Sequence, residues 1–126
     1  MSANDPKKRG RPARQSQADA FYVYCVGERD ALSPLIEGEL PDAIETDSAI
    51  EMVCGGALAG VASAVPLADY GEDALQARLA DPAWTALRAM RHEKVIEHFA
   101  SRASVVPLRF GTIYHRRERI EQMLGE

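Results

Sequence analysis

Short apolar runs separated by glycine and proline dominate the pattern of this chain. Residues 21–26 are almost all aromatic or β-branched and are followed by a glycine, which is typical of a strand near the centre of a sheet. Two further apolar runs, 50–54 and 58–65, flank Gly55 and Gly56. Because glycine adopts the positive φ of tight hairpin turns, these runs predict a β-hairpin. The run 58–65 is rich in small residues, so we expect another element to pack closely against it.

The segment 82–100 has the period of an amphipathic helix. Asp81 is a typical N-cap residue, and Pro82 suits the first helical position. We expect one face of this helix to pack on the sheet, because its apolar residues recur at helical spacing. The residues predicted for that face are Trp84, Leu87, Val95 and Phe99.

The remaining patterns are shorter. Residues 105–110 predict a strand, in which Pro107 favours an edge position or a bulge because proline has no N–H to donate. A short helix is expected around Leu75 and Leu79, and a terminal helix over 113–124. The acidic segment 28–48 shows only a weak helical pattern.

The order of these elements is strand, hairpin, two helices, strand and helix. Helices grouped after paired strands predict the α+β class. We therefore expect a small antiparallel or mixed sheet of about four strands, with helices packed on one face. A chain of 126 residues has room for one such domain.

The N-terminal residues differ from the rest in charge and hydropathy. Residues 1–19 have a net charge of +3, and the remainder has −7 because the whole chain has −4. Their charged residues are Lys7, Lys8, Arg9, Arg11 and Arg14 against Asp5 and Asp19. A segment this poor in apolar residues cannot offset its ordering entropy by burial. We predict a disordered basic tail over 1–19 and a folded domain over 20–126.

The sequence also indicates the cellular compartment in which the protein is expected. No apolar run approaches the length of about 20 residues that spans a bilayer, and no hydrophobic region follows the basic residues as in a signal peptide. We expect a cytoplasmic protein. Cys25 and Cys54 are then expected to be reduced thiols, with a disulfide as the alternative.

The histidines and the candidate nucleophiles of the chain form no pattern typical of catalysis or metal binding. The three histidines, His92, His98 and His115, lack the spacing of metal ligands, because position 96 is isoleucine and no thiols lie near them. No order of Ser, His and Asp or of Cys and His has support, and no phosphate loop is present. We expect no catalytic residue, metal or cofactor, no small-molecule substrate and no membrane partner, which argues against an enzyme.

One motif in the tail has a chemical interpretation. The core of Arg9, Gly10, Arg11 and Pro12 resembles an AT-hook, whose extended Arg-Gly-Arg lies in the narrow minor groove of A·T-rich DNA. The alternative is a solvated basic tail with non-specific, salt-sensitive attraction to nucleic acid. Both interpretations remain open at this point.

Four segments together are similar to a known family. The opening strand YVYCV is followed by GGALAGVASAVPLADYGEDAL at 55–75, RHEKVIEHF at 91–99 and VVPLRFGTIY at 105–114. In order and spacing they resemble the N-terminal domain of the GvpL/GvpF family of gas vesicle accessory proteins, over residues 20–124. The resemblance implies a ferredoxin-like or related α+β domain. Family members usually carry a second, C-terminal domain, and the basic tail departs from their pattern.

The resemblance also implies a function. It implies a gas vesicle-associated protein that assists vesicle assembly by binding the main shell protein, with other gas vesicle accessory proteins as further candidate partners. We expect contact by strand addition at the edge around 105–110 or at the hairpin strand 58–65. The candidate contact residues are Leu58, Val61, Val65, Val106, Arg109 and Phe110.

Two alternatives accompany these expectations. Arg109 is expected to form a structural ion pair, with Glu93 or Asp69 as its partner, and partner contact is its second interpretation. The second functional hypothesis is a nucleic-acid-binding or regulatory protein that works through the AT-hook-like tail.

Overall fold

The structure is a computed structural model that describes residues 19–125 of the chain. Its elements are β1 (Asp19–Glu28), α2 (Arg29–Ile36), β2 (Ile50–Gly55), β3 (Leu58–Pro66), α3 (Leu67–Tyr70), α4 (Glu72–Leu79), α5 (Pro82–Ala100), β4 (Val105–Pro107), β5 (Ile113–Tyr114) and α6 (Arg117–Gly125). Of the predicted tail, all but Asp19 lies outside the described residues, and Asp19 is the first residue of β1.

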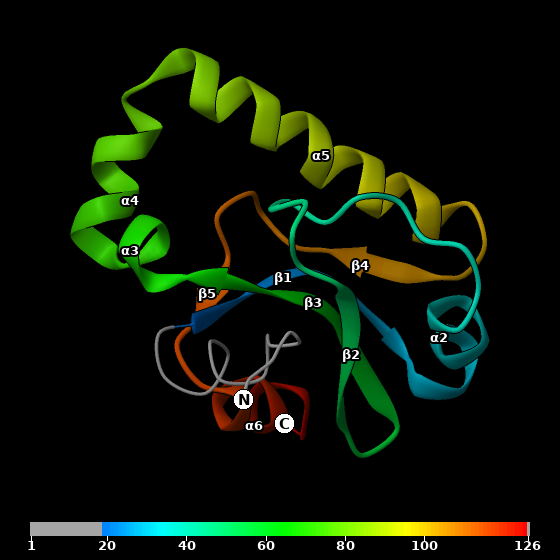
Figure 1. Cartoon of the computed structure of the whole chain (residues 1–126). Coiled ribbons are helices and arrows are strands. Elements are labelled where there is room, and N and C mark those ends of the chain that lie inside the picture. The colour runs from blue at the N-terminus through cyan, green and yellow to red at the C-terminus, as the bar shows by residue number, and fades with distance from the viewer. Residues whose placement is uncertain (1–18, 126) are drawn as a thin grey trace, which may run out of the picture.

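The strands form one antiparallel sheet in the order β2-β3-β1-β4, with β5 also paired to β1 (Figure 1). The predicted α+β class and the antiparallel sheet are confirmed. A helix follows β1, and helices also follow β3, so the chain has the βαββαβ succession of ferredoxin-like folds. The long strand β1 is central, because β3 pairs along one edge and both β4 and β5 pair along the other.

A bulge in β1 decides which of its side chains face which helices. The register with β3 shifts between Val23 and Cys25, so Tyr24 is the extra residue. Phe21 and Val23 therefore lie on one face, and Tyr22, Tyr24 and Cys25 all lie on the other. A regular strand would alternate without interruption. The bulge thus places Cys25 on the same face of the sheet as the two tyrosines.

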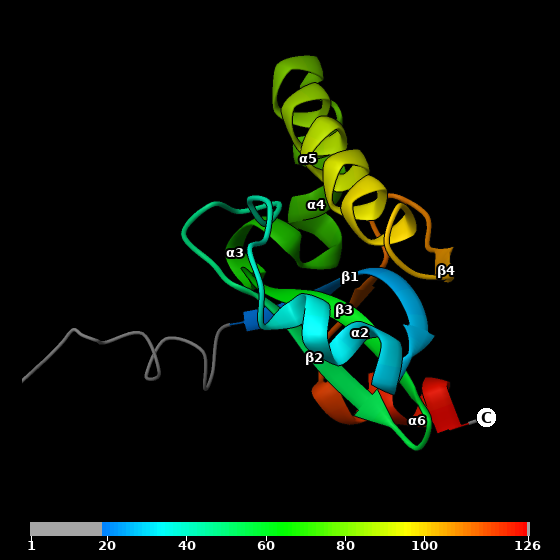
Figure 2. The same ribbon diagram turned by 90° about the vertical axis from the view of Figure 1, so that its right-hand side faces the viewer.

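Helices cover both faces of the sheet, above and below it in Figure 2. On the first face, α2 contributes Leu32 and α5 contributes Val95 and Phe99 to a shared core. This is the arrangement expected from the sequence. On the opposite face, α6 contributes Ile120 and Leu124 to a smaller core. The terminal helix thus gives the sheet a second cover, beyond the single covered face that was predicted.

The close approach of α6 depends on small residues in the hairpin. A Cβ atom at Gly55 would lie 2.7 Å from Leu124 Cβ and 2.9 Å from the carbonyl oxygen of Glu121. At Gly60 it would lie 3.6 Å from Ile120. The predicted close packing on the small-residue strand is therefore confirmed. Gly55 itself belongs to β2, and the turn has its positive φ, +67°, at Gly56.

Helix α5 begins and ends at the predicted residues, but its buried face differs from the prediction. Asp81 caps it by accepting the backbone N–H groups of Ala83 and Trp84 at 3.0 and 3.3 Å. Leu87 is 45% exposed, whereas His92 is buried. The buried face of α5 includes Phe99 and His92, and helical spacing extends this face to position 88. Leu87 lies beside that face and not on it, so its assignment to the buried face was wrong.

The segment after α5 also differs from the prediction. The expected strand 105–110 ends at Pro107, and the chain turns at Gly111, whose φ is +89°. Residues 113–114 then form β5 against β1, whereas a helix had been expected to begin there. Two short strands share this edge of β1 because the chain leaves the ladder between Leu108, whose N–H still donates to the carbonyl of Tyr24, and Thr112, whose carbonyl accepts the N–H of Val23. The expected edge position of Pro107 is confirmed.

Replacing Gly55 with alanine tests the packing of α6. We expect Gly55→Ala to lower the free energy of unfolding by about 1–3 kcal/mol, because the new methyl group meets backbone and Cβ atoms of α6. Gly38→Ala is the matched control, since its nearest neighbours would lie at 3.7 Å. Urea denaturation followed by circular dichroism measures both variants. Equal stability of the two would contradict this account of the packing.

Candidate functional site

The structure separates the residues that were predicted to contact a partner. Val61 and Val65 are fully buried in the core, and both edges of their strand, β3, are paired. Strand addition at this hairpin strand is therefore not available in the folded domain. Leu58 and Val106, in contrast, are 38% and 64% exposed.

Leu58 and Val106 lie at the same open hollow on the surface. The hollow has a volume of about 470 Å³ and is lined by Val26, Gly27, Glu28, Leu58, Ser104, Val105 and Val106. Its geometry follows from the sheet, because Glu28 pairs with Leu58 on one side of β1 and Val26 pairs with Val106 on the other. The edge strand β4 forms one wall. An apolar hollow at a sheet edge is a surface suited to another chain.

Arg109 and Phe110 are not brought into this hollow. Phe110 packs edge-on against His92, with ring centroids 5.6 Å apart. Arg109 is exposed, and none of the ion pairs within residues 19–125 includes it. Asp69 pairs instead with Arg78 at 2.6 Å, so the expected ion pair of Arg109 is wrong. The tail residues Arg9, Gly10, Arg11 and Pro12 lie outside the described residues.

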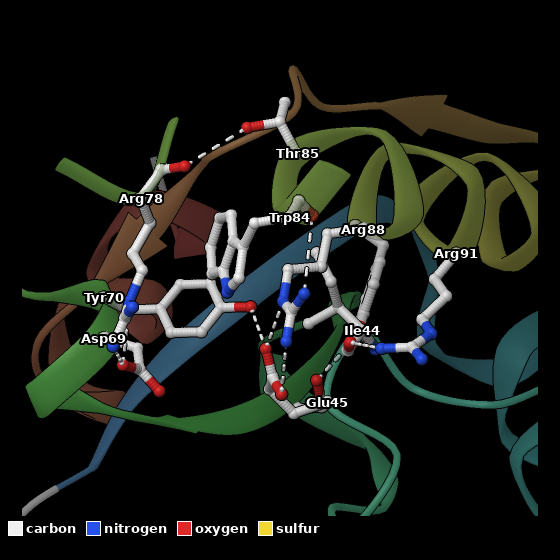
Figure 3. Close-up of polar contacts among 11 residues, drawn as sticks. Ile44, Glu45, Asp69, Tyr70, Arg78, Trp84, Thr85, Arg88 and Arg91 are labelled. Atoms are coloured by element: carbon white, nitrogen blue, oxygen red, sulfur yellow. Dashed lines mark hydrogen bonds and ion pairs between the residues drawn. The ribbon is translucent and has the colours of Figure 1, made fainter. Parts of the chain in front are cut away.

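Sequence reasoning missed a polar network between α5 and the connection that leads into β2 (Figure 3). Its centre is the carboxylate of Glu45. Arg88 donates to Glu45 through Nε at 2.7 Å and through a terminal nitrogen at 3.3 Å. The hydroxyl of Tyr70 donates to the same carboxylate. Both charged side chains are about five-sixths buried, with 15% and 16% exposed, so this pair is shielded from water.

Neighbouring groups hold Arg88 in this position. Its guanidinium lies over the ring of Trp84, 4.2 Å from the centroid, and Trp84 in turn packs against Tyr70. Such cation–π contacts stabilise a partly desolvated arginine. One turn further along α5, Arg91 donates to the carbonyl of Ile44 at 2.9 Å. Two arginines of α5 thus fasten consecutive residues of one irregular connection.

Burial and the charges of neighbouring groups determine the protonation of Arg88 and Tyr70. Burial alone would lower the pKa of Arg88, but its hydrogen bonds and charge attraction to Glu45 outweigh that effect and raise it. Burial raises the pKa of the Tyr70 phenol, and the adjacent Glu45 raises it further. Tyr70 is therefore a neutral donor and Arg88 a cation at physiological pH. The Glu45 carboxylate is an acceptor that these two side chains already engage.

Three further hydrogen bonds lie deeper, where the two tyrosines of β1 face α5. Tyr24 accepts the backbone N–H of Ile44 at 2.8 Å and bonds to Ser63 at 2.7 Å. Tyr22 accepts the backbone N–H of Gly111 at 2.9 Å. Burial raises the pKa of Tyr24 to about 12, so its phenol stays protonated. These hydroxyls satisfy backbone groups that the irregular connections bury.

Tyr22 also contacts His92. The hydroxyl oxygen of Tyr22 lies 2.8 Å from Nδ1 of the His92 ring, and His92 makes a further hydrogen bond with the backbone of Leu108. Burial lowers the pKa of His92, with the nearby charge of Glu93 and the Leu108 bond as partial offsets. A neutral imidazole with its proton on Nε2 lets the Tyr22 hydroxyl, which accepts from Gly111, donate to Nδ1.

These groups hold the fold together and have little free chemical capacity. The tyrosines, His92 and Glu45 all have partners within the domain. Burial raises the pKa of the Cys25 thiol to about 12, which suppresses the thiolate needed for nucleophilic attack. Within the described part of the chain, Cys25 and Cys54 are free, and no group of three His, Cys, Asp or Glu side chains is placed to hold a metal ion. No helix of residues 19–125 is long and apolar enough to cross a membrane.

The burial of the Glu45–Arg88 pair predicts that it contributes more to stability than the more exposed pair of Asp69 and Arg78. We expect Glu45→Gln to lower the free energy of unfolding by about 1–3 kcal/mol, because it removes a charge that accepts buried hydrogen bonds. Asp69→Asn, the matched control, disrupts the more exposed pair with Arg78 and is expected to cost less than about 1 kcal/mol. Guanidinium denaturation measures both. An equal loss in the two variants would show that burial does not strengthen the Glu45 pair.

Comparison with known proteins identifies one family. The family model described as gas vesicle synthesis protein GvpL/GvpF matches residues 20–126, which cover nearly the whole described domain. Searches of curated protein sequences and of solved structures found no significant match. The family match therefore carries the assignment. The chain belongs to the GvpL/GvpF family of gas vesicle synthesis proteins.

Proposed function

We propose that this protein assists gas vesicle assembly by binding the main shell protein at the open edge of its sheet. Membership of the GvpL/GvpF family gives the chain a gas vesicle-related role. The observation that carries the finer proposal is the apolar hollow beside β4, with Leu58 and Val106 exposed on its rim. This surface is the contact site, and the proposal involves no catalytic step.

The chemistry of the edge favours side-chain contact supported by a few backbone hydrogen bonds. Strand β4 has only three residues, and one of them, Pro107, has no N–H to offer an added strand. A long added strand would therefore find few donors here. Val106 compensates with a large exposed apolar side chain, and Leu58 extends the apolar surface from the hairpin side.

An apolar gas vesicle shell subunit matches the chemistry of this apolar hollow. Apolar shell subunits would aggregate if left exposed before assembly, so a partner that covers apolar surface protects them. The hollow offers apolar contact without a buried charge, since Glu28 on its rim is exposed.

Substitutions at the rim test this proposal. We expect Leu58→Lys with Val106→Lys to reduce capture of the host's main gas vesicle shell protein at least about tenfold in a co-expression pull-down, because lysine places a charge at an apolar contact. Thermal unfolding should change little, because both side chains are exposed. The control is Leu79→Lys with Leu87→Lys, which alters two exposed leucines on α4 and α5.

The pull-down distinguishes an error in the contact site from an error in the assembly proposal itself. Retention of the shell protein by the control variant and its loss by the rim variant would support the edge as the contact site. Equal retention by both variants would contradict it. Failure of the unaltered chain to capture the shell protein would overturn the assembly proposal itself.

A further inference from the structure

The outer edge of β2 is a second surface at which the sheet can be extended. The strand order β2-β3-β1-β4 makes β2 the edge strand opposite β4, and within residues 19–125 no strand pairs with its outer side. Figure 2 shows β2 and β4 at opposite borders of the sheet. The outer edge of β2 is therefore a site distinct from the apolar hollow beside β4.

The hydrogen bonds of β1 show which residues of β2 bond to β3. Val23 donates its N–H to the carbonyl of Thr112, on the side of β1 that faces away from β3. Its partner in β3, Ala62, therefore directs its own N–H and carbonyl toward β2, where the register places Glu51 opposite it. Ala62 and Glu51 are thus a hydrogen-bonded pair.

The residues on either side of Glu51 have the opposite orientation. Along an antiparallel ladder, residues bonded to one neighbouring strand alternate with residues whose N–H and carbonyl face the other way. Ile50, Met52 and Cys54 therefore direct these groups to the outer edge of β2. Within residues 19–125, no other backbone hydrogen bond occupies them.

β2 lacks the features that protect an edge strand from pairing. Protected edges are short, bulged, or interrupted by proline or lysine. β4 has only three residues and contains Pro107, whereas β2 has six residues in unbroken register with β3 and contains neither proline nor lysine. Its one charged side chain, Glu51, is paired with Arg117 at 2.8 Å. The outer edge of β2 is therefore suited to the addition of a strand.

β2 is complementary to itself in the antiparallel direction. When Met52 of each copy lies at a two-fold axis, Ile50 of one copy lies opposite Cys54 of the other. This register pairs every outward N–H of the three residues with an outward carbonyl. Glu51 then lies opposite Val53 of the second copy, so no like charges face each other.

The hairpin turn carries a positive charge that the same register uses. Arg29 donates its backbone N–H to the carbonyl of Ala57 at 2.8 Å, and its guanidinium donates to the carbonyl of Gly56 at 3.1 Å. Arg29 is thereby fixed at the turn that follows β2. Its one ion pair within residues 19–125 is a contact of 3.5 Å with its exposed neighbour Asp30, which leaves it half exposed.

Charge complementarity favours a second copy as the occupant of this edge. Continued past Cys54, the two-fold register brings the turn at 56–57 opposite Ser48 and Asp47 of the second copy. Asp47 is exposed, and it takes part in none of the ion pairs of the described residues. Arg29 of each copy therefore meets Asp47 of the other, and the symmetry forms this pair twice.

We propose that two copies of this chain associate by antiparallel pairing of their β2 strands, with Arg29 of each copy against Asp47 of the other. The two sheets then form one continuous sheet whose outer strands are the two β4 strands. Both apolar hollows remain open at its ends, so the dimer presents two copies of the proposed shell-protein site. The pairing goes beyond shell-protein binding and does not depend on it.

A charge exchange tests the partner, measured on the full chain by sedimentation equilibrium. We expect the unaltered chain to dimerise, and Arg29→Asp or Asp47→Arg alone to weaken dimerisation at least about tenfold, because each sets like charges against each other twice. Both changes in one chain should restore the affinity to within about threefold. The control is Arg102→Asp, at an exposed arginine beyond α5, which should change the affinity less than about twofold.

An engineered disulfide tests the register. Residues of a hydrogen-bonded antiparallel pair have Cα atoms about 5.5 Å apart, which is within the range that a disulfide spans. Met52→Cys with Cys54→Ser should therefore give a covalent dimer after mild oxidation, seen on a non-reducing gel. Met90→Cys with Cys54→Ser is the matched control and should stay monomeric, because Met90 lies on the exposed side of α5.

Thermal unfolding of every variant shows whether the domain remains folded. The proposal is overturned if the unaltered chain is a monomer at all concentrations, or if the charge exchange fails to restore dimerisation. Equal yields of covalent dimer from the two cysteine variants would overturn the register centred on Met52. Loss of shell-protein capture in the rim variant would leave dimerisation intact, because that variant alters neither Arg29 nor the outer edge of β2.

Discussion

The hydroxyl groups of two buried tyrosines on β1 organise the layer above the sheet. Tyr22 and Tyr24 lie on the same face of β1, toward α5, and the bulge at Tyr24 adds Cys25 to that face. Tyr24 accepts the N–H of Ile44, and Tyr22 accepts the N–H of Gly111. Two irregular connections, far apart in sequence, are thus bound to the same central strand.

The remaining contacts build on these two bonds. Because Ile44 is held by Tyr24, its neighbour Glu45 lies where Arg88 and Tyr70 reach it, and α5 is fastened to the sheet. Because Gly111 is held by Tyr22, the chain returns to β1 as β5 before α6 begins. The first connection stabilises the helical layer. The second leads into β5 and α6, while β4 remains as the edge beside the apolar hollow.

The sequence predicted local structure better than contacts between distant segments. Helix α5 and the hairpin were predictable because Asp81, Pro82 and the Gly55-Gly56 pair are local signals. Glu45 carried no such signal, because it lies in an irregular acidic segment and its partner Arg88 is 43 residues away. The family resemblance was confirmed, whereas Val61 and Val65 proved to be buried. Whether an apolar strand lies at an edge or in the centre depends on pairing, which one sequence does not show.

Amide hydrogen exchange measured by NMR tests most directly whether the two hydroxyls act separately. Tyr24→Phe should speed exchange of the Ile44 amide and leave the Gly111 amide nearly unchanged, because only the Ile44 N–H loses its acceptor. Tyr22→Phe should have the converse effect. If each variant accelerates both amides equally, or neither amide responds, then the tyrosine hydroxyls do not hold the two connections as described.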